Sequence, residues 1–138
     1  MLGGQWYGQW LPNDVRRYWG SDKRLGTQVG ERRGRDIVTT GKSGYLLFGP
    51  YLNLAVGDYK ITVYGRADIN RLAGASIDIV THGSSRVIKE TTLCEPFINE
   101  ELADIIITLD EPCTDLEIRI LVNFDTSLVV SSLNIHPL

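Results

Sequence analysis

Short alternating segments separated by turn residues fill the sequence from residue 36 to the C-terminus. In "DYKITVYGRA", Tyr59, Ile61 and Val63 alternate with polar neighbours. A period of two places successive side chains on opposite faces of a strand, so the segment predicts a strand with one buried face. "ASIDIVTH" repeats the pattern, and the turn "HGSS" between it and "RVIKETTL" predicts a hairpin.

About nine segments share this character, at the spacing typical of an antiparallel sandwich or barrel. They are 26–31, 36–40, 44–51, 58–67, 75–82, 86–93, 103–110, 114–124 and 127–138. Helical signals are limited to single turns near 12–18 and 96–105. The sequence therefore predicts an all-β fold, an antiparallel two-sheet β-sandwich with about nine strands.

Length and composition fit one globular domain. The 138 residues, 43% of them hydrophobic, can bury a core without metal or disulfide staples. No apolar run approaches the roughly 20 residues that cross a bilayer, so we expect no membrane span. The first residues lack the basic start and apolar block of a signal peptide. If Met1 is the native start, we expect a cytoplasmic protein.

Residues capable of chemistry are sparse and scattered. Cys94 and Cys113 have no accompanying Cys/His cluster, so we expect two free thiols, with a disulfide as the alternative, and no metal site. His82 adjoins a predicted turn and His136 is near the C-terminus. No nucleophile elbow, phosphate-binding loop or dinucleotide fingerprint is present. We therefore expect no cofactor and no catalysis by this domain.

Charge is distributed unevenly along the chain, although the net charge is only −3. Residues 15–35 hold seven Lys and Arg against two acids, whereas residues 90–125 hold ten acids and Arg119. The basic segment favours phosphate or an acidic glycan as a partner, or it pairs with the protein's own acidic half. Nucleic acid is not expected, because the whole chain is acidic and lacks an aromatic-basic strand motif.

The segment "GYLLFGPYLNLAVGDYKITVYG" (44–65) combines turn glycines with core positions. Its expected core residues are Leu46, Phe48, Tyr51, Leu52 and Leu54. It resembles the "G…GPY…L…G.Y.v…G" signature of jelly-roll, carbohydrate-binding-module-like domains, the galactose-binding-like class. Such domains are appended to bacterial glycosyltransferases and other surface-polysaccharide proteins. The matching positions are Gly44, Gly49, Pro50, Tyr51, Leu54, Gly57, Tyr59 and Gly65.

The resemblance implies a jelly-roll sandwich over 25–138, preceded by an aromatic-rich lead-in over 1–24 that is either an added strand or a lid. It implies a non-catalytic accessory domain of a glycosyltransferase or polysaccharide assembly protein. The expected partners are a glycan and either a neighbouring catalytic domain or a second copy. Structural calcium, which some members bind, is not expected, because its acidic loop is not recognisable. The alternative is a structural or oligomerisation sandwich without a sugar site.

Aromatic and arginine side chains make up the predicted ligand-binding site. A flat aromatic ring stacks on the apolar face of a pyranose, and polar side chains around it bind the hydroxyls. The stretch "GQWYGQWLPNDVRRYWG" (4–20) concentrates such rings. Each tryptophan either stacks on sugar or covers one end of the sandwich as core. The predicted site residues are Trp10, Tyr18, Trp19, Arg24, Tyr45, Tyr51, Tyr64 and Arg66.

A mixed-charge surface is also expected on the polar sides of the predicted strands. Tyr, Trp and Arg are enriched at protein interfaces, so this surface favours self-association. We expect its residues to share one sheet face. They are Lys60, Tyr64, Arg66, Asp78, Glu117 and Arg119.

Overall fold

The fold is taken from a computed structural model that describes residues 15–72, 74–93 and 100–138. Within these ranges the chain forms β1 (Arg16–Trp19), β2 (Glu31–Arg33), β3 (Asp36–Val38), β4 (Gly44–Leu54), β5 (Gly57–Ala67), β6 (Ser76–Thr81), β7 (Arg86–Thr92), β8 (Glu101–Leu109), β9 (Cys113–Val122) and β10 (Leu128–Pro137). A 3-10 turn, η2 (Ile69–Arg71), follows β5. None of the described residues belongs to a helix long and apolar enough to cross a membrane.

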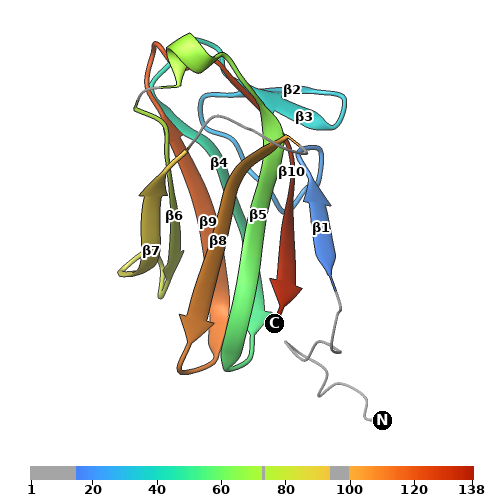
Figure 1. Ribbon diagram of the computed structural model, residues 1–138, viewed down its shortest axis with the longest axis vertical. Coiled ribbons are helices and arrows are strands. Elements are labelled where there is room, and N and C mark those ends of the chain that lie inside the picture. Colours follow the sequence, from blue (N-terminus) through green and yellow to red (C-terminus); the bar gives the residue numbers. More distant parts are fainter. Residues whose placement is uncertain (1–14, 73, 94–99) are drawn as a thin grey trace.

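The strands form two antiparallel sheets packed face to face (Figure 1). Sheet A has the order β2-β3-β10-β5-β8, and β1 also pairs with β10. Sheet B has the order β4-β9-β6-β7. The predicted all-β, two-sheet sandwich is confirmed, with ten strands among the described residues where about nine are predicted. The predicted hairpin is also confirmed, since β6 and β7 pair antiparallel around residues 82–85.

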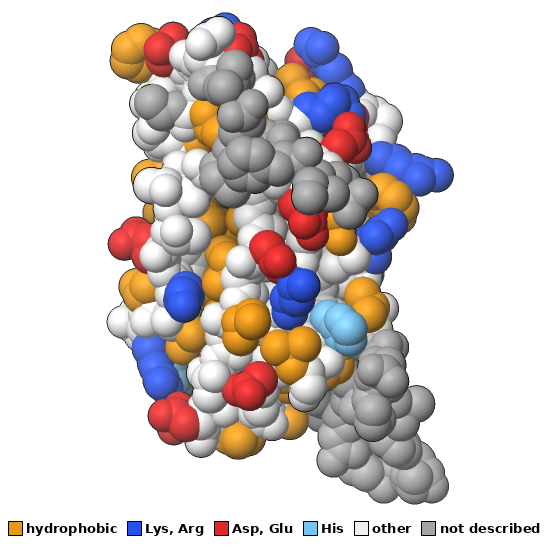
Figure 2. Space-filling view, in the orientation of Figure 1, with side chains coloured by type: hydrophobic (Ala, Val, Ile, Leu, Met, Phe, Trp, Pro, Cys, Tyr) orange, Lys and Arg blue, Asp and Glu red, His pale blue; other side chains and the backbone are white. Residues whose placement is uncertain are grey.

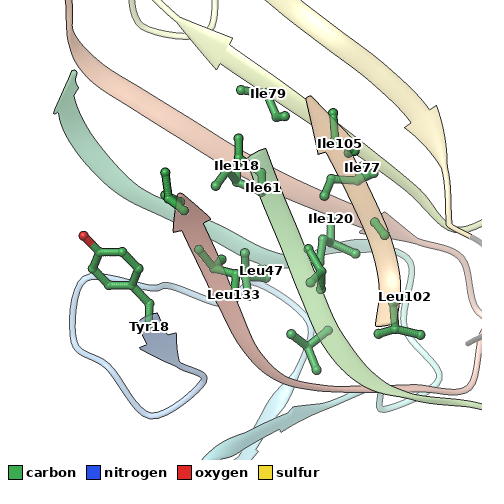
Figure 3. Packing of buried hydrophobic residues seen from close by; sticks show 14 of the residues in the cluster. Tyr18, Leu47, Ile61, Ile77, Ile79, Leu102, Ile105, Ile118, Ile120 and Leu133 are labelled. Carbon is green, nitrogen blue, oxygen red and sulfur yellow. The ribbon is translucent and has the colours of Figure 1, made fainter. Parts of the chain in front are cut away.

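The core fills the space between the inner faces of the sheets (Figure 3). Ile61 and Leu133 of sheet A face Leu47, Ile118 and Ile120 of sheet B, and all five side chains are fully buried. Branched side chains suit this position because they pack well on a pleated, half-buried surface. The alternation predicted for β5 is confirmed, and its other face is left for polar side chains.

Strand β1 lies within the predicted lead-in. It pairs with the C-terminal half of β10, from Arg16 opposite Ile135 to Trp19 opposite Ser132. Strand β3 pairs with the other half of the same edge. Of the two alternatives for the lead-in, an added strand or a lid, residues 16–19 form the strand. The single turn expected near 12–18 is therefore wrong for residues 16–18, and residues 1–14 lie outside the described part of the chain.

The strand predicted over 26–31 is wrong for residues 26–30, and only Glu31 belongs to a strand, as the first residue of β2. Gly26 makes one isolated bridge with Phe48 of β4. After it, the Thr27 hydroxyl accepts a hydrogen bond from the Gly30 N–H at 2.8 Å, which closes a turn. The Arg32 guanidinium also donates hydrogen bonds to backbone carbonyls of the 20–25 segment. Residues 26–30 therefore fold back as a loop, and β2 starts only at Glu31.

Two further expectations for 44–65 are corrected. The three predicted core leucines are buried, but Phe48 is half-buried against Gly26 and Tyr51 is 51% exposed. The strand β4 is irregular at this point, with register shifts on both sides of Leu52. A local break in alternation of this kind turns one side chain outwards.

The predicted mixed-charge surface is divided between two faces. Lys60, Tyr64 and Arg66 belong to β5 in sheet A, whereas the three other residues belong to β6 and β9 in sheet B. The polar faces of the two sheets point away from each other, because both apolar faces point inwards. Alternation shows which side of a strand is polar, but it does not show to which sheet the strand belongs.

Cys113 is a free thiol at the start of β9. Burial is the largest effect on its pKa and raises it above the ordinary thiol value. A protonated, buried thiol behaves as a small apolar side chain. Cys94, the other cysteine of the predicted pair, lies outside the described residues.

Candidate functional site

The predicted site residues separate into two groups on opposite sides of the sandwich. Tyr45 and Tyr51 belong to β4 of sheet B. Trp19, Tyr64 and Arg66 belong to β1 and β5 of sheet A. The sequence therefore identifies residues of two surfaces and not of one site.

Three predicted residues fall elsewhere. Tyr18 is only 2% exposed and packs in the core, so it presents no ring to a ligand. Arg24 lies over that ring at 4.7 Å from its centroid and pairs with Asp22 at 2.8 Å. The hydrogen bond from Arg24 lowers the pKa of Asp22, so the guanidinium is engaged locally. Trp10 lies outside the described residues.

A paired arginine and aspartate occupy the centre of the outer face of sheet B. Arg119 of β9 and Asp78 of β6 are opposite each other in the strand register. Two hydrogen bonds join them, from Nε to Oδ1 at 2.9 Å and from Nη2 to Oδ2 at 2.7 Å. Their side chains are 18% and 15% exposed. The hydrogen bonds to Asp78 raise the pKa of Arg119, and the fork geometry fixes both side chains.

Tyr45 extends this pair towards β4. The Arg119 guanidinium lies 5.0 Å from the Tyr45 ring centroid, within the range of a cation–π contact. The backbone of Tyr45 is held by Gln28, whose side-chain Oε1 accepts the Tyr45 N–H at 2.9 Å and whose N–H donates to the Tyr45 carbonyl at 3.0 Å. The Tyr45 backbone is thus held by Gln28, and its partly buried ring is contacted by Arg119.

Glu117 is the second carboxylate of this face and is only 8% exposed. Its two oxygens accept separate hydrogen bonds, from the Tyr51 hydroxyl at 3.0 Å and from Ser84 Oγ at 3.1 Å. The pKa of Tyr51 is raised, mainly by burial and to a smaller extent by the hydrogen bond to Glu117. Tyr51 has a φ of 64°, which is uncommon for an aromatic residue. Backbone outliers of this kind gather at functional sites.

The β6–β7 turn is fastened to β9 by a third carboxylate. Asp115 accepts hydrogen bonds from the backbone N–H groups of His82 at 2.9 Å and Gly83 at 2.8 Å. These two hydrogen bonds lower the pKa of Asp115, and the bond from Gly83 has the larger effect. The turn is thus fixed with Ser84 directed at Glu117.

Low pH is expected to weaken the two hydrogen bonds that join the β6–β7 turn to Asp115. A carboxyl whose pKa is lower in the folded state stabilises the fold above its ordinary value, here 3.8, and loses that contribution as the pH falls further. Asp115→Asn should therefore cost about 1 kcal/mol near neutral pH and flatten the loss of stability below pH ~4. Urea unfolding between pH 2.5 and 7 measures both effects.

The control for this prediction is Asp110→Asn. Asp110 is a well-exposed carboxylate that contacts only Arg86 among its described ion pairs, at 3.3 Å. Its replacement should leave the stability at neutral pH within about 0.5 kcal/mol of the wild type. Equal pH dependence of Asp115→Asn and the wild type would show that the turn is held by other contacts.

The assembled face is suited to a ligand rich in hydroxyl groups. Arg119 supplies N–H donors, Asp78 and Glu117 supply acceptors, and two tyrosine rings supply apolar surface. Glu90 of β7 lies opposite Asp78 and adds a further carboxylate to the surface. Among the residues described, no group of three or more His, Cys, Asp or Glu is arranged to hold a metal ion.

Sequence reasoning missed Ser84 as a member of this site and did not connect Asp78, Glu117 and Arg119 with the tyrosines. The alternation in "TDLEIRILV" does place Glu117 and Arg119 on one side of a strand. Their proximity to Tyr45 depends on β4 and β9 being neighbours, which is a long-range pairing. No local pattern in the sequence contains that information.

Comparisons with known proteins bear on the fold. No protein-family model matches the sequence, and a comparison with curated proteins finds no match. Among solved structures, the chain is similar to the C-terminal CBM6 of LamC, a marine laminarinase from Zobellia galactanivorans. The TM-score is 0.61 at 8% identity, over 89% of this chain and 99% of that chain.

Two further structures are similar. The carbohydrate-binding module CBM6cm-2 of Cellvibrio mixtus lichenase 5A, in complex with cellotriose, matches with a TM-score of 0.54 and 9% identity, over 93% of this chain and 99% of that one. A glycosylation-associated protein complex from Streptococcus agalactiae matches with a TM-score of 0.56 and 14% identity, over 96% of this chain and 27% of that one. The chain therefore has a jelly-roll fold like that of carbohydrate-binding modules, as the 44–65 signature implied.

Proposed function

We propose that this chain is a non-catalytic glycan-binding domain and that its saccharide binds on the outer face of sheet B. One observation carries the proposal: on one face, two tyrosine rings each contact one of two neighbouring hydrogen-bonded pairs of side chains. Arg119 is bonded to Asp78 and lies against Tyr45, and Glu117 accepts hydrogen bonds from Ser84 and Tyr51. These groups come from β4, β6, β9 and the β6–β7 turn, so the fold itself assembles them.

The aromatic part of the site receives the apolar face of a sugar ring. Tyr51 is half exposed, and its hydroxyl is bonded to Glu117, so the ring is available while its position is fixed. Tyr45 has the Arg119 guanidinium against it and is partly accessible. Rings held in place before binding lose little conformational entropy, which favours affinity on an open surface.

The polar part of the site favours a neutral saccharide. Asp78 and Glu117 carry two negative charges against the single positive charge of Arg119, and Glu90 is opposite Asp78 across the β6–β7 pair. An acidic sugar would meet repulsion at this face. Hydroxyl groups, in contrast, bond both to carboxylate oxygens and to guanidinium N–H groups.

The domain is proposed to serve as an accessory to a larger glycan-processing protein, such as a glycosyltransferase or polysaccharide assembly protein. Two of the similar structures are modules of a laminarinase and a lichenase. The third is a chain of a glycosylation-associated protein complex, and the match covers 27% of that chain. Catalysis would then belong to another domain or chain, and this domain would hold the glycan near it.

Titration calorimetry with a panel of neutral β-glucan, mannan and galactan oligosaccharides tests the proposal. At least one of them should bind the wild type, and Tyr51→Ala should weaken that binding about tenfold, because a stacking ring contributes about 1.4 kcal/mol. Tyr45→Ala should have a similar effect. The matched control is Tyr64→Ala, which removes the same side chain from the outer face of sheet A.

Two results would contradict the proposal. If no member of the panel binds and light scattering shows a concentration-dependent dimer, the chain is a structural or oligomerisation domain. If Tyr64→Ala weakens binding as much as Tyr51→Ala does, the glycan does not bind on sheet B.

A further inference from the structure

We propose that the outer face of sheet A carries a second saccharide site, selective for acidic sugars. Arg17 and Arg35, held against Trp19, would bind the carboxylate or sulfate group of the ligand. This inference rests on the proposed function in one respect, namely that the ligand is a saccharide. The site is separate from the one on sheet B and has the opposite charge.

Two guanidinium groups share the Trp19 ring. The Arg17 Cζ lies 5.2 Å from the ring centroid and the Arg35 Cζ lies 4.5 Å from it. Arg17 also lies 5.6 Å from the ring centroid of Tyr64, and its Nε donates to Asn134 Oδ1 at 2.9 Å. Cation–π contacts of this kind fix the direction of otherwise mobile side chains.

The strand register explains why these groups meet. Arg17 and Trp19 are two residues apart on β1, so both point outwards while Tyr18 between them points into the core. Across the sheet, Arg17 is opposite Asn134 of β10, and Trp19 is opposite Ser132. Arg35 arrives from the turn that joins β2 and β3.

The positive charge of Arg17 and Arg35 is not neutralised within the described part of the chain. No carboxylate there lies within ion-pair distance of either guanidinium. The three acids of residues 15–42 are engaged by other arginines, in the pairs Asp22–Arg24, Glu31–Arg33 and Asp36–Arg66. The same residues hold eight Lys and Arg, so the local net charge is +5.

The acidic half of the chain does not supply the missing partners. Its described ion pairs are made with Lys60, Arg71 and Arg86, and Arg119 pairs with Asp78. The Nε2 atom of His82 lies 3.6 Å from Glu111. The sequence leaves open whether the basic segment pairs with that half or meets an anionic ligand. No described ion pair joins the two. In Figure 2, Lys and Arg side chains gather on one edge of the molecule, over β2 and β3.

An anionic group held beside the Trp19 ring would be attracted by both guanidinium groups. Guanidinium groups bind carboxylate and sulfate oxygens with pairs of parallel hydrogen bonds, which gives selectivity as well as affinity. Trp19 then serves to position the arginines, a role that differs from both alternatives that the sequence left open for it, a stacking platform or a core cover. Asn134 and Tyr64 border the arginines and are suited to the hydroxyls and the ring of the same sugar.

Calorimetry with three trisaccharides of one sugar type tests this site. Trigalacturonate and sulfated galactotriose carry the anionic groups, and galactotriose is their neutral counterpart. In the Tyr51→Ala variant, whose sheet B site is weakened, we expect the anionic ligands to bind at least tenfold more tightly than galactotriose, with an affinity that falls as salt is added. The double variant Arg17→Gln/Arg35→Gln should lose this binding.

The control is Arg33→Gln, which removes an exposed arginine of the same segment that is paired with Glu31. It should leave the affinity for the acidic ligands within about twofold. Tyr51→Ala should also leave it unchanged, which separates this site from the one on sheet B. Correct folding of the double variant is shown by its unchanged affinity for the neutral glycan of the sheet B site, or by an unchanged urea midpoint.

Several outcomes would overturn the second site. They are equal binding of galactotriose and the acidic ligands by the Tyr51→Ala variant, full binding of the acidic ligands by the Arg17→Gln/Arg35→Gln variant, and no binding of either acidic ligand. Competition by inorganic sulfate at the same concentration as the sulfated sugar would show a site for small anions and not for saccharides. None of these outcomes affects neutral glycan binding on sheet B, which is measured separately.

Discussion

Replacing Gly65 with alanine is expected to destabilise the fold by about 3 kcal/mol or more, the upper end for an overpacked site. A Cβ atom at this position would overlap the backbone carbonyl oxygen of Val129 and lie 2.7 Å from Leu102 Cδ1. Gly65 is opposite Val130 of β10, and its N–H donates to the carbonyl of Glu100 at 2.8 Å. Strand β5 is thus confined on both sides and cannot move away.

Urea unfolding followed by far-UV circular dichroism measures this effect. The matched control is Gly34→Ala, where φ is +61° but no atom lies within 4 Å of the added Cβ. That change should cost only about 1 kcal/mol, from the backbone conformation alone. If Gly65→Ala costs no more than Gly34→Ala, the close approach of β5 and β10 described above is wrong.

Replacing Arg119 with methionine is expected to have the second largest effect, because it leaves Asp78 without its partner. Removing one member of a fully buried ion pair costs about 3–5 kcal/mol. Both side chains here retain some contact with water, so we expect a smaller cost of about 2 kcal/mol. The same variant should bind the neutral glycan with an affinity more than tenfold lower, because the N–H donors of Arg119 and its contact with the Tyr45 ring are both removed.

A double variant separates the two effects. Arg119→Met/Asp78→Leu removes both charges together, and we expect it to regain most of the stability but none of the glycan affinity. The control is Arg86→Met. Arg86 pairs with Asp110 and Glu111 in exposed positions, and its loss should cost less than about 1 kcal/mol and leave binding unchanged. Full glycan affinity in the double variant would exclude Asp78 and Arg119 from the site.

Much of the fold is predictable because its determinants are local. The alternation of Tyr59, Ile61 and Val63 predicts the buried face of β5, and all three are buried. The hairpin of β6 and β7 follows from a turn sequence between two alternating segments. Period-two patterns specify the strand and its inner face wherever one face is buried.

Features that depend on distant pairing could not be predicted. The sequence of β1, two arginines followed by two aromatic residues, shows no alternation of apolar and polar side chains, so it does not predict a strand. These residues form a strand by pairing with the edge of β10. Arg119 and Asp78 are 41 positions apart and meet only through the β6–β9 register. The register also decides that Tyr45 and Tyr64 lie on different sheets, which separates one predicted site into two surfaces.

The candidate site illustrates the same limit at single residues. Tyr18 and Trp19 are adjacent aromatic residues, so residue type alone predicts the same ligand-binding role for both. Once residues 16–19 are a strand, alternation places Tyr18 in the core and Trp19 outside, beside Arg17. Residue type thus predicts which side chains can bind a sugar, whereas strand pairing determines which of them are able to act together.

Chemical-shift mapping of the ¹⁵N-labelled chain during titration with the best neutral oligosaccharide tests the central claim most directly. Glycan binding on sheet B predicts that the largest shift changes occur in β4, β6, β9 and the 82–85 turn. Amides of β1, β5 and β10 should change little. Shift changes centred on sheet A, or none with any neutral oligosaccharide of the panel, would contradict the assignment of this face as the glycan site.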